Sequence, residues 1–206
     1  MSVFLLRKRF SPPDIWQGIQ PMFSLWIFLW PVYHSVAWIW VGLLLMICLV
    51  LATALVRTPF WRHLRSAWSG ASPVMAGLPL PALSLNLALF VAVILFEQDM
   101  PEFGLGLALV ASLAFPLARI ADRLRWVAMP TRLHPGHTLV GHLALVLSAA
   151  ILCAWSIHAY HGVDWLIIFP STIAAAALGS LVRIVLPQWW NMPIAIAAMA
   201  SLLWYL

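Results

Sequence analysis

The sequence contains too few charged residues to cover a water-facing surface. Of its 206 residues, 8% are charged and 64% are hydrophobic, far from the balance of a soluble domain. A small globule could not hide so much apolar surface, because a large part of any small protein stays exposed. The composition therefore excludes an ordinary soluble enzyme and indicates a chain whose solvent is lipid.

Several motifs are absent as well. No Walker-type phosphate loop occurs, so any use of ATP is expected to come from a partner. No small-residue cleavage site follows the first apolar run, so no cleavable signal peptide is predicted. The two cysteines, Cys48 and Cys153, lack the spacing of a redox pair and are predicted to be small buried side chains. The sequence indicates no particular cofactor.

What the sequence does contain is a series of long apolar runs. A helix needs about 20 apolar residues to cross a bilayer core, and seven runs approach that length: 16–33, 36–56, 80–96, 100–118, 138–157, 165–182 and 188–206. We predict an all-α, polytopic bundle of about seven spans, with six as the alternative count. Residues 1–15 form a cytoplasmic interfacial segment, and 1–206 is a single integral membrane domain.

All eleven Lys and Arg residues fall into four short clusters near 7–9, 57–65, 119–132 and 183. With seven spans, these clusters share one side of the membrane, and an excess of cations marks the cytoplasmic side. The N-terminus is therefore predicted inside, in a bacterial-type inner membrane. The net charge of +5 lies in loops beside the membrane, which indicates attraction to anionic lipids rather than to nucleic acid.

One basic pattern lies at the predicted cytoplasmic start of the fifth span. Arg132, His134, Gly136 and His137 precede a helix start, where free backbone N–H groups favour anions. We predict that these four residues bind an anionic lipid headgroup, with Arg132, His134 and His137 as catalytic residues if the protein is an enzyme. The alternative is an ordinary loop at a basic interface.

A second pattern lies on the predicted outer face. His158 and His161 are three residues apart, Asp164 follows three residues later, and His34 lies on the same side of the membrane. Imidazoles with a carboxylate can bind a divalent metal. These four residues are the candidate metal or haem site, and solvated interfacial histidines are the alternative.

Small residues recur in the sixth span. Ser171, Ala175 and Gly179 are spaced four apart, which allows close helix packing. Such a face can serve the bundle itself, a protein partner or a second copy of the chain, and we expect partners of this kind alongside membrane lipids.

Three partial resemblances follow from these segments. Gly136-His137 resembles part of the Pro-Ser-Gly-His motif of membrane phosphatidic-acid phosphatases, but Trp189 stands where their nucleophile belongs. Pro135-Gly136-His137 is similar to a segment of CDP-diacylglycerol synthases, without their metal-binding aspartates. The layout of 57–81 resembles the cytoplasmic segment of six-span membrane subunits of ABC exporters.

Two functional hypotheses follow. The first is a non-catalytic membrane subunit of a larger transport or envelope assembly, acting as its translocating or anchoring component and using a partner's energy. The second is a small lipid-modifying enzyme that acts on phosphate-bearing lipid at the cytoplasmic face. An outer-face metal or haem protein is the third possibility.

Overall fold

The computed structural model describes residues 40–41, 44–45, 47–48, 51, 80–96, 100–123, 136–186 and 190–205. Every regular element within these ranges is a helix, which confirms the predicted all-α class for this part of the chain. The interfacial segment 1–15 and the first predicted span lie outside the described residues, as do His34, Arg132 and His134. Of the second predicted span, only seven residues are described.

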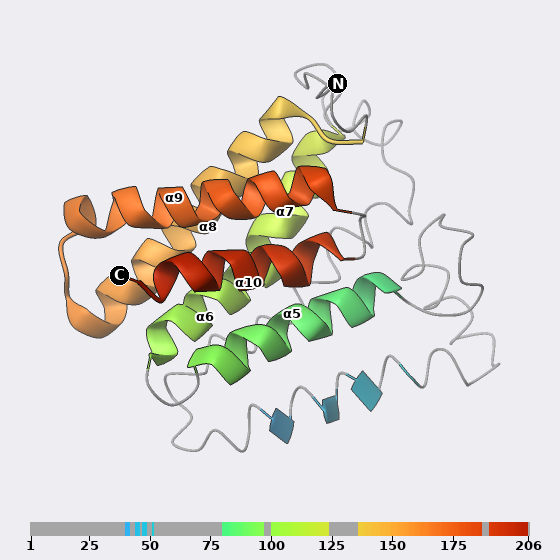
Figure 1. The fold of residues 1–206 in the computed structure, drawn as a ribbon, viewed down its shortest axis with the longest axis horizontal. Helices are drawn as coiled ribbons and strands as arrows, with labels where there is room; N and C mark the ends of the chain where they lie inside the picture. Colours follow the sequence, from blue (N-terminus) through green and yellow to red (C-terminus); the bar gives the residue numbers. More distant parts are fainter. Residues whose placement is uncertain are drawn as a thin grey trace, which may run out of the picture.

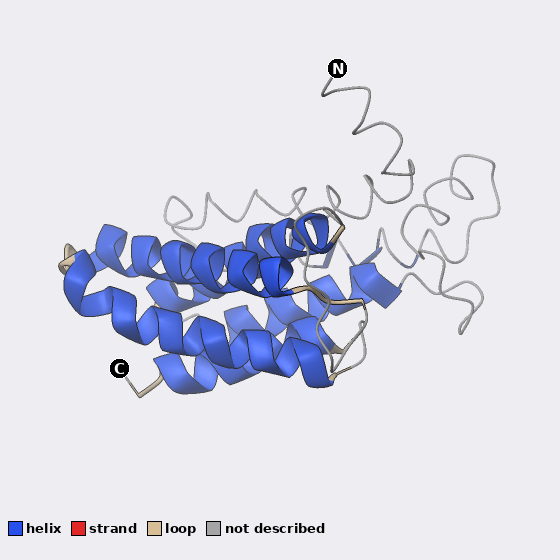
Figure 2. Ribbon diagram, turned by 90° about the horizontal axis from the view of Figure 1, so that it is seen from above, coloured by secondary structure: helices blue, strands red, loops and turns tan. Residues whose placement is uncertain are grey.

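The elements follow one another as an up-and-down series (Figure 1). They are α5 (Leu80–Phe96), α6 (Pro101–Leu109), η2 (Val110–Ala114), α7 (Phe115–Asp122), α8 (Leu139–His161), α9 (Trp165–Val185) and α10 (Asn191–Leu203). The segments α6, η2 and α7 are continuous and form one long helix. Seen from above, these helices lie lengthwise in one bundle (Figure 2), and in Figure 1 α7 and α8 are tilted against α9 and α10.

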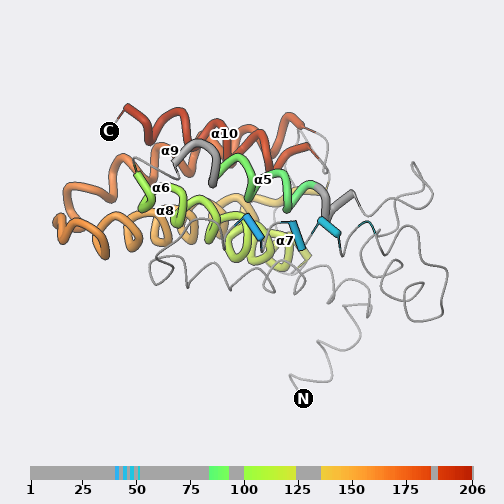
Figure 3. Tube along the Cα trace, turned by 90° about the horizontal axis from the view of Figure 1, so that it is seen from below, coloured from blue at the N-terminus to red at the C-terminus, as the bar shows by residue number. Residues whose placement is uncertain are grey.

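The long helix 101–122 lies at the centre of the bundle. It packs against α5, α8 and α10 (Figure 3). The helix α9 packs against α8 and α10. Among the three longest helices it is the most buried. Its inward residues are mostly alanine, leucine and glycine, so neighbouring backbones can approach from several sides.

A wide helical turn interrupts this central helix at Val110–Ala114. Pro116 lies two residues after this turn, and proline lacks an N–H and collides with the carbonyl four residues earlier in a regular α-helix. A single π turn relieves that collision without ending the helix. The helix therefore continues to Asp122, four residues beyond the predicted end of the span at 118.

Within the described ranges, three helices are long and apolar enough to cross a membrane: Pro101–Asp122, Leu139–His161 and Trp165–Val185. The helix α10 is shorter, with 13 residues where a run of 188–206 was predicted. Pro193 lies in its first turn, where the missing N–H of proline costs no hydrogen bond. The structure thus supports a membrane protein, although Cys48, predicted to be buried, is exposed.

The outer surface of α8 is a stripe of large apolar side chains. Every fourth residue on this helix faces outward and is about half exposed: Leu139, Leu143, Leu147, Ile151 and Trp155. Such a continuous apolar stripe is rare on the surface of a soluble monomer. It is the surface expected of a helix in contact with lipid.

The ends of α8 and α9 are set by local hydrogen bonds. The Thr138 hydroxyl accepts the Gly141 N–H at 3.0 Å and caps the start of α8. Gly162 ends that helix with φ +64°, a conformation that residues with a Cβ rarely adopt. Asp164 then caps α9 by accepting the Leu166 N–H at 3.0 Å. Gly162 and Asp164 therefore set the turn between α8 and α9.

The helices α9 and α10 meet at a glycine. A Cβ placed on Gly179 would lie 2.7 Å from Met199 Sδ and 2.8 Å from Met199 Cγ. Ala175, one turn earlier on the same face, is completely buried. The predicted small-residue face thus packs inside the bundle at Ala175 and Gly179, while Ser171 is half-buried.

We predict that Gly179→Ala lowers the thermal midpoint of unfolding in detergent, because the new methyl group overlaps Met199. The cost of such overpacking is about 1–3 kcal/mol. Met199→Ala removes the overlapping atoms, so the double variant should regain part of the loss despite the cavity. Purely additive losses in the two variants would contradict this packing.

Candidate functional site

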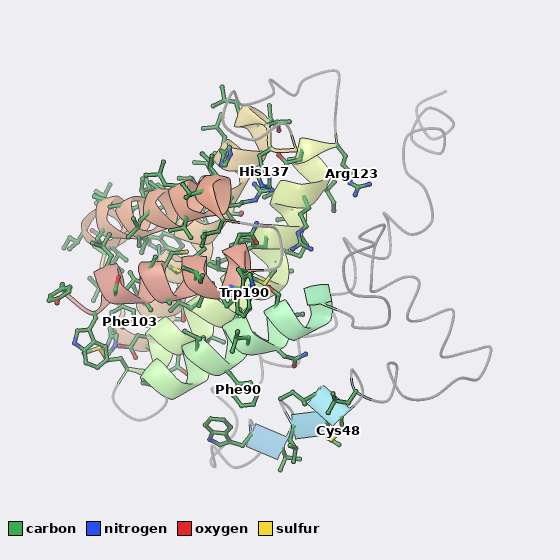
Figure 4. All side chains as sticks on the ribbon, turned by 45° about the vertical axis from the view of Figure 1, so that its right-hand side comes forward. Cys48, Phe90, Phe103, Arg123, His137 and Trp190 are labelled. Carbon is green, nitrogen blue, oxygen red and sulfur yellow. The ribbon has the colours of Figure 1, made fainter. Side chains whose placement is uncertain are left out.

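The described charged residues gather at the two ends of the bundle. Arg119, Arg123 and Arg183 lie at the end where α7 finishes, and Glu102 and Asp164 lie at the opposite end. Figure 4 shows His137 and Arg123 together at the first of these ends and Phe103 at the other. We call the first end the basic end.

Asp122 is the centre of the basic end. It is the last residue of α7, and its side chain is only 8% exposed. Its Oδ2 accepts a hydrogen bond from Arg183 Nη2 on α9, which is a charge-assisted contact. His137 Nδ1 lies 3.4 Å from the same oxygen.

The other oxygen of Asp122 binds the start of α8. Its Oδ1 accepts the Thr138 N–H at 2.8 Å and the Thr138 hydroxyl at 2.9 Å. Since Thr138 Oγ1 also accepts the Gly141 N–H, the hydroxyl links the carboxylate to the first turn of α8. One carboxylate therefore joins the ends of α7, α8 and α9.

Gly141 permits this close approach. A Cβ at this position would lie 1.9 Å from Asp122 Oδ1 and 3.1 Å from the Ala118 carbonyl oxygen. The backbone oxygen cannot move aside, and the carboxylate is held by its hydrogen bonds. Only a residue without a side chain fits here, so Gly141 is part of the site.

A second polar pair lies one helical turn deeper. His142 Nδ1 and Ser180 Oγ share a hydrogen bond of 2.7 Å between α8 and α9, and both residues are buried. The ring centroids of His137 and His142 are 5.9 Å apart. The imidazole of His142 therefore extends the Asp122 cluster into the bundle.

Among the described residues, Arg183 is the largest of the fully buried side chains, at 1% exposure. The sequence indicated a residue at the edge of a span. In the structure its side chain is instead buried in the bundle and donates to Asp122 on α7. Arg119, which is half-buried, lies within electrostatic range of both Arg183 and Asp122. Two arginines of this end, Arg119 and Arg183, thus lie near a single described carboxylate.

The predicted headgroup-binding residues are only partly brought together. His137 is buried and lies against Asp122, so it holds the start of α8 in place rather than facing outward. Gly136 is exposed beside it. Arg132 and His134 lie outside the described residues.

At the opposite end, the predicted metal-binding residues have other contacts. His158 Nδ1 lies 2.8 Å from the Val163 carbonyl oxygen, and His161 Nε2 lies 2.9 Å from Glu102 Oε1. Asp164 caps α9. Within the described ranges, no three His, Cys, Asp or Glu residues lie close enough to hold a metal ion. His34 is outside those ranges, so a site that includes it stays a prediction.

Sequence reasoning missed Asp122, His142 and Ser180. Asp122 sits among arginines just after an apolar run, so it was counted with a cytoplasmic loop. One signal was present, because Asp122 is the single acid between Arg119 and His137. A buried cation needs an anion, and the predicted span 165–182 before Arg183 contains no Asp or Glu. Asp122 was therefore a candidate partner for Arg183.

No protein-family model matches this sequence, and neither the curated proteins nor the solved structures include a match to it. The site must therefore be interpreted from its own chemistry. That chemistry is a buried carboxylate bound by cations, next to a buried histidine and serine pair.

We predict that Asp122→Ala lowers the free energy of unfolding by about 3–5 kcal/mol, since it leaves the Arg183 charge buried without its anion. Arg183→Met should be destabilising in turn. The double variant should lose clearly less than the two single losses added together, because neither charge is left alone. Denaturant unfolding in micelles measures all three, and additive losses would show that the pair is not coupled.

Proposed function

We propose that this protein is a multi-pass protein of a bacterial-type inner membrane, with about seven spans and its N-terminus in the cytoplasm. In this proposal it is a non-catalytic subunit of a larger transport or envelope assembly, as the translocating or anchoring component, and a partner supplies energy. The three long apolar helices and the exposed stripe on α8 support the membrane setting.

The observation that carries the non-catalytic role is the use of Asp122. A catalytic acid or base must reach a substrate, but both oxygens of this carboxylate already accept hydrogen bonds from Arg183 and Thr138. His137 lies against it. These groups connect helix ends, which is what a structural subunit requires.

The alternating helices support the proposed orientation. Arg119, Arg123 and Arg183 share one end of the bundle, and Glu102 and Asp164 share the other. Because cations concentrate on the cytoplasmic side, the basic end is the cytoplasmic end in this proposal. The C-terminal end of α10 then faces the periplasm.

A second candidate function is a lipid-modifying enzyme acting on phosphate-bearing lipid. The observation in its favour is the 2.7 Å contact between His142 and Ser180, one turn from Arg183. An imidazole can activate a hydroxyl, and a guanidinium can stabilise a charged phosphate. In this candidate, Ser180 and His142 carry the reaction in place of His137.

Orientation is tested by labelling single cysteines in whole cells with a membrane-impermeant maleimide. In a background of Cys48→Ala and Cys153→Ala, Tyr205→Cys should react because this exposed position follows α10. Gly136→Cys, which is also exposed but lies at the basic end, should react only after the cells are permeabilised. The reverse labelling pattern would overturn the orientation.

Function is tested by purifying the tagged protein in mild detergent and identifying the proteins and lipids that stay bound. A stoichiometric membrane protein or ATP-hydrolysing partner is the expected result. A lone chain that turns over phospholipid, with activity abolished by Ser180→Ala and retained in Ser148→Ala, would establish the enzyme instead. Ser148 is a matched control because its hydroxyl binds only its own helix backbone, at Ala144 and Leu145.

A further inference from the structure

Among the buried polar atoms that have no hydrogen-bond partner in the described part of the chain, two lie beside Asp122 at the basic end: Arg183 Nη1 and His142 Nε2. Arg183 is 1% exposed and His142 is 8% exposed, so bulk water does not readily satisfy either atom. Leaving such groups unpaired is costly, and native proteins usually fill these positions.

The two atoms belong to a single cluster. Arg183 binds Asp122 through Nη2, which leaves the other terminal nitrogen of the same guanidinium for a second acceptor. His142 lies within electrostatic range of Arg183, His137 and Asp122. When the Ser180 hydroxyl donates to Nδ1, Nε2 of His142 carries the proton and becomes a donor.

The charge of the cluster favours an anion. Arg119 and Arg183 lie near a single described carboxylate, Asp122, which leaves an excess of positive charge in the cluster. The sequence between the described parts adds Arg125 and Arg132 and no acid. The start of α8 lies at the same place, and the N-terminus of a helix also favours negative charge.

We propose that the basic end holds a binding site for a phosphate group, in which Arg183 Nη1 and His142 Nε2 donate to the phosphate oxygens and Arg119 contributes charge. Arginine suits this role because its planar guanidinium can donate to two different oxygens at once. Asp122 orients Arg183 by occupying its other nitrogen. The phosphate comes either from a lipid headgroup or from free phosphate, and the site itself does not depend on the subunit role.

The test uses the full-length protein in a neutral detergent. Thermal unfolding is followed with increasing inorganic phosphate and, separately, with sodium chloride at equal ionic strength. A bound ligand raises the midpoint with its concentration. We expect phosphate to raise the midpoint of the wild-type protein and chloride to have little effect.

Two variants locate the site while keeping the fold. His142→Asn keeps a polar group where Nδ1 binds Ser180 and removes Nε2, and Arg119→Gln removes a half-buried charge. Each should weaken the apparent phosphate affinity about tenfold, the effect of losing one charge-assisted contact. Ser180→Ala is the control for any disturbance of the contact between α8 and α9, because it removes the His142–Ser180 hydrogen bond and leaves Nε2 in place. Its phosphate affinity should change less than that of His142→Asn.

Equal effects of phosphate and chloride would overturn the proposal, and so would phosphate binding that neither His142→Asn nor Arg119→Gln weakens. The lipid source is tested in nanodiscs of phosphatidylcholine with and without phosphatidic acid. Stabilisation by phosphatidic acid that both variants weaken supports a headgroup ligand, whereas binding of inorganic phosphate alone supports free phosphate. Since no partner is present in these measurements, their outcome is independent of the subunit proposal.

Discussion

The contact between Asp122 and Arg183 is the interaction on which the arrangement of the described bundle depends. It joins residues 61 positions apart in the sequence, and the same carboxylate binds Thr138 on a third helix. A buried charge must be paired and hydrogen-bonded, because the alternative is an ion in a low-dielectric interior. The pair therefore fixes how far α9 can slide along α7 and where α8 begins.

Close packing makes this contact possible. Lipid removes the hydrophobic force that drives helices together in water, so van der Waals packing and polar contacts between helices must hold a membrane bundle together. Gly141 lets the carboxylate reach α8, and Gly179 lets α10 reach α9. The small residues and the Asp122 cluster thus depend on each other, since a bulkier residue at position 141 would separate the helices that the carboxylate joins.

Apolar run lengths predicted where the described helices lie, but not which of them pack together. The predicted run 80–96 is the observed α5, and the predicted start of the sixth span at Trp165 is the observed start of α9. Both positions follow from local chemistry: apolar length in one case and the Asp164 cap in the other. The role of Asp122 could not be predicted in this way, because it depends on residues 15 to 61 positions away. The charged residues around Asp122 also indicated a loop, whereas the helix continues through the π turn and Pro116 as far as Asp122.

The two ends of the bundle use charge differently. At the end opposite the basic end, Glu102 pairs with His161. The His161 side chain is 52% exposed, so water can hydrogen-bond to its remaining polar groups. At the basic end Arg183 is enclosed, and a buried ion pair is often no more stable than apolar residues of the same size. Stability alone therefore does not explain Arg183, because its Nη1 has no hydrogen-bond partner among the described residues. The proposed phosphate at the basic end would supply that partner, which gives a reason for a buried arginine at this position.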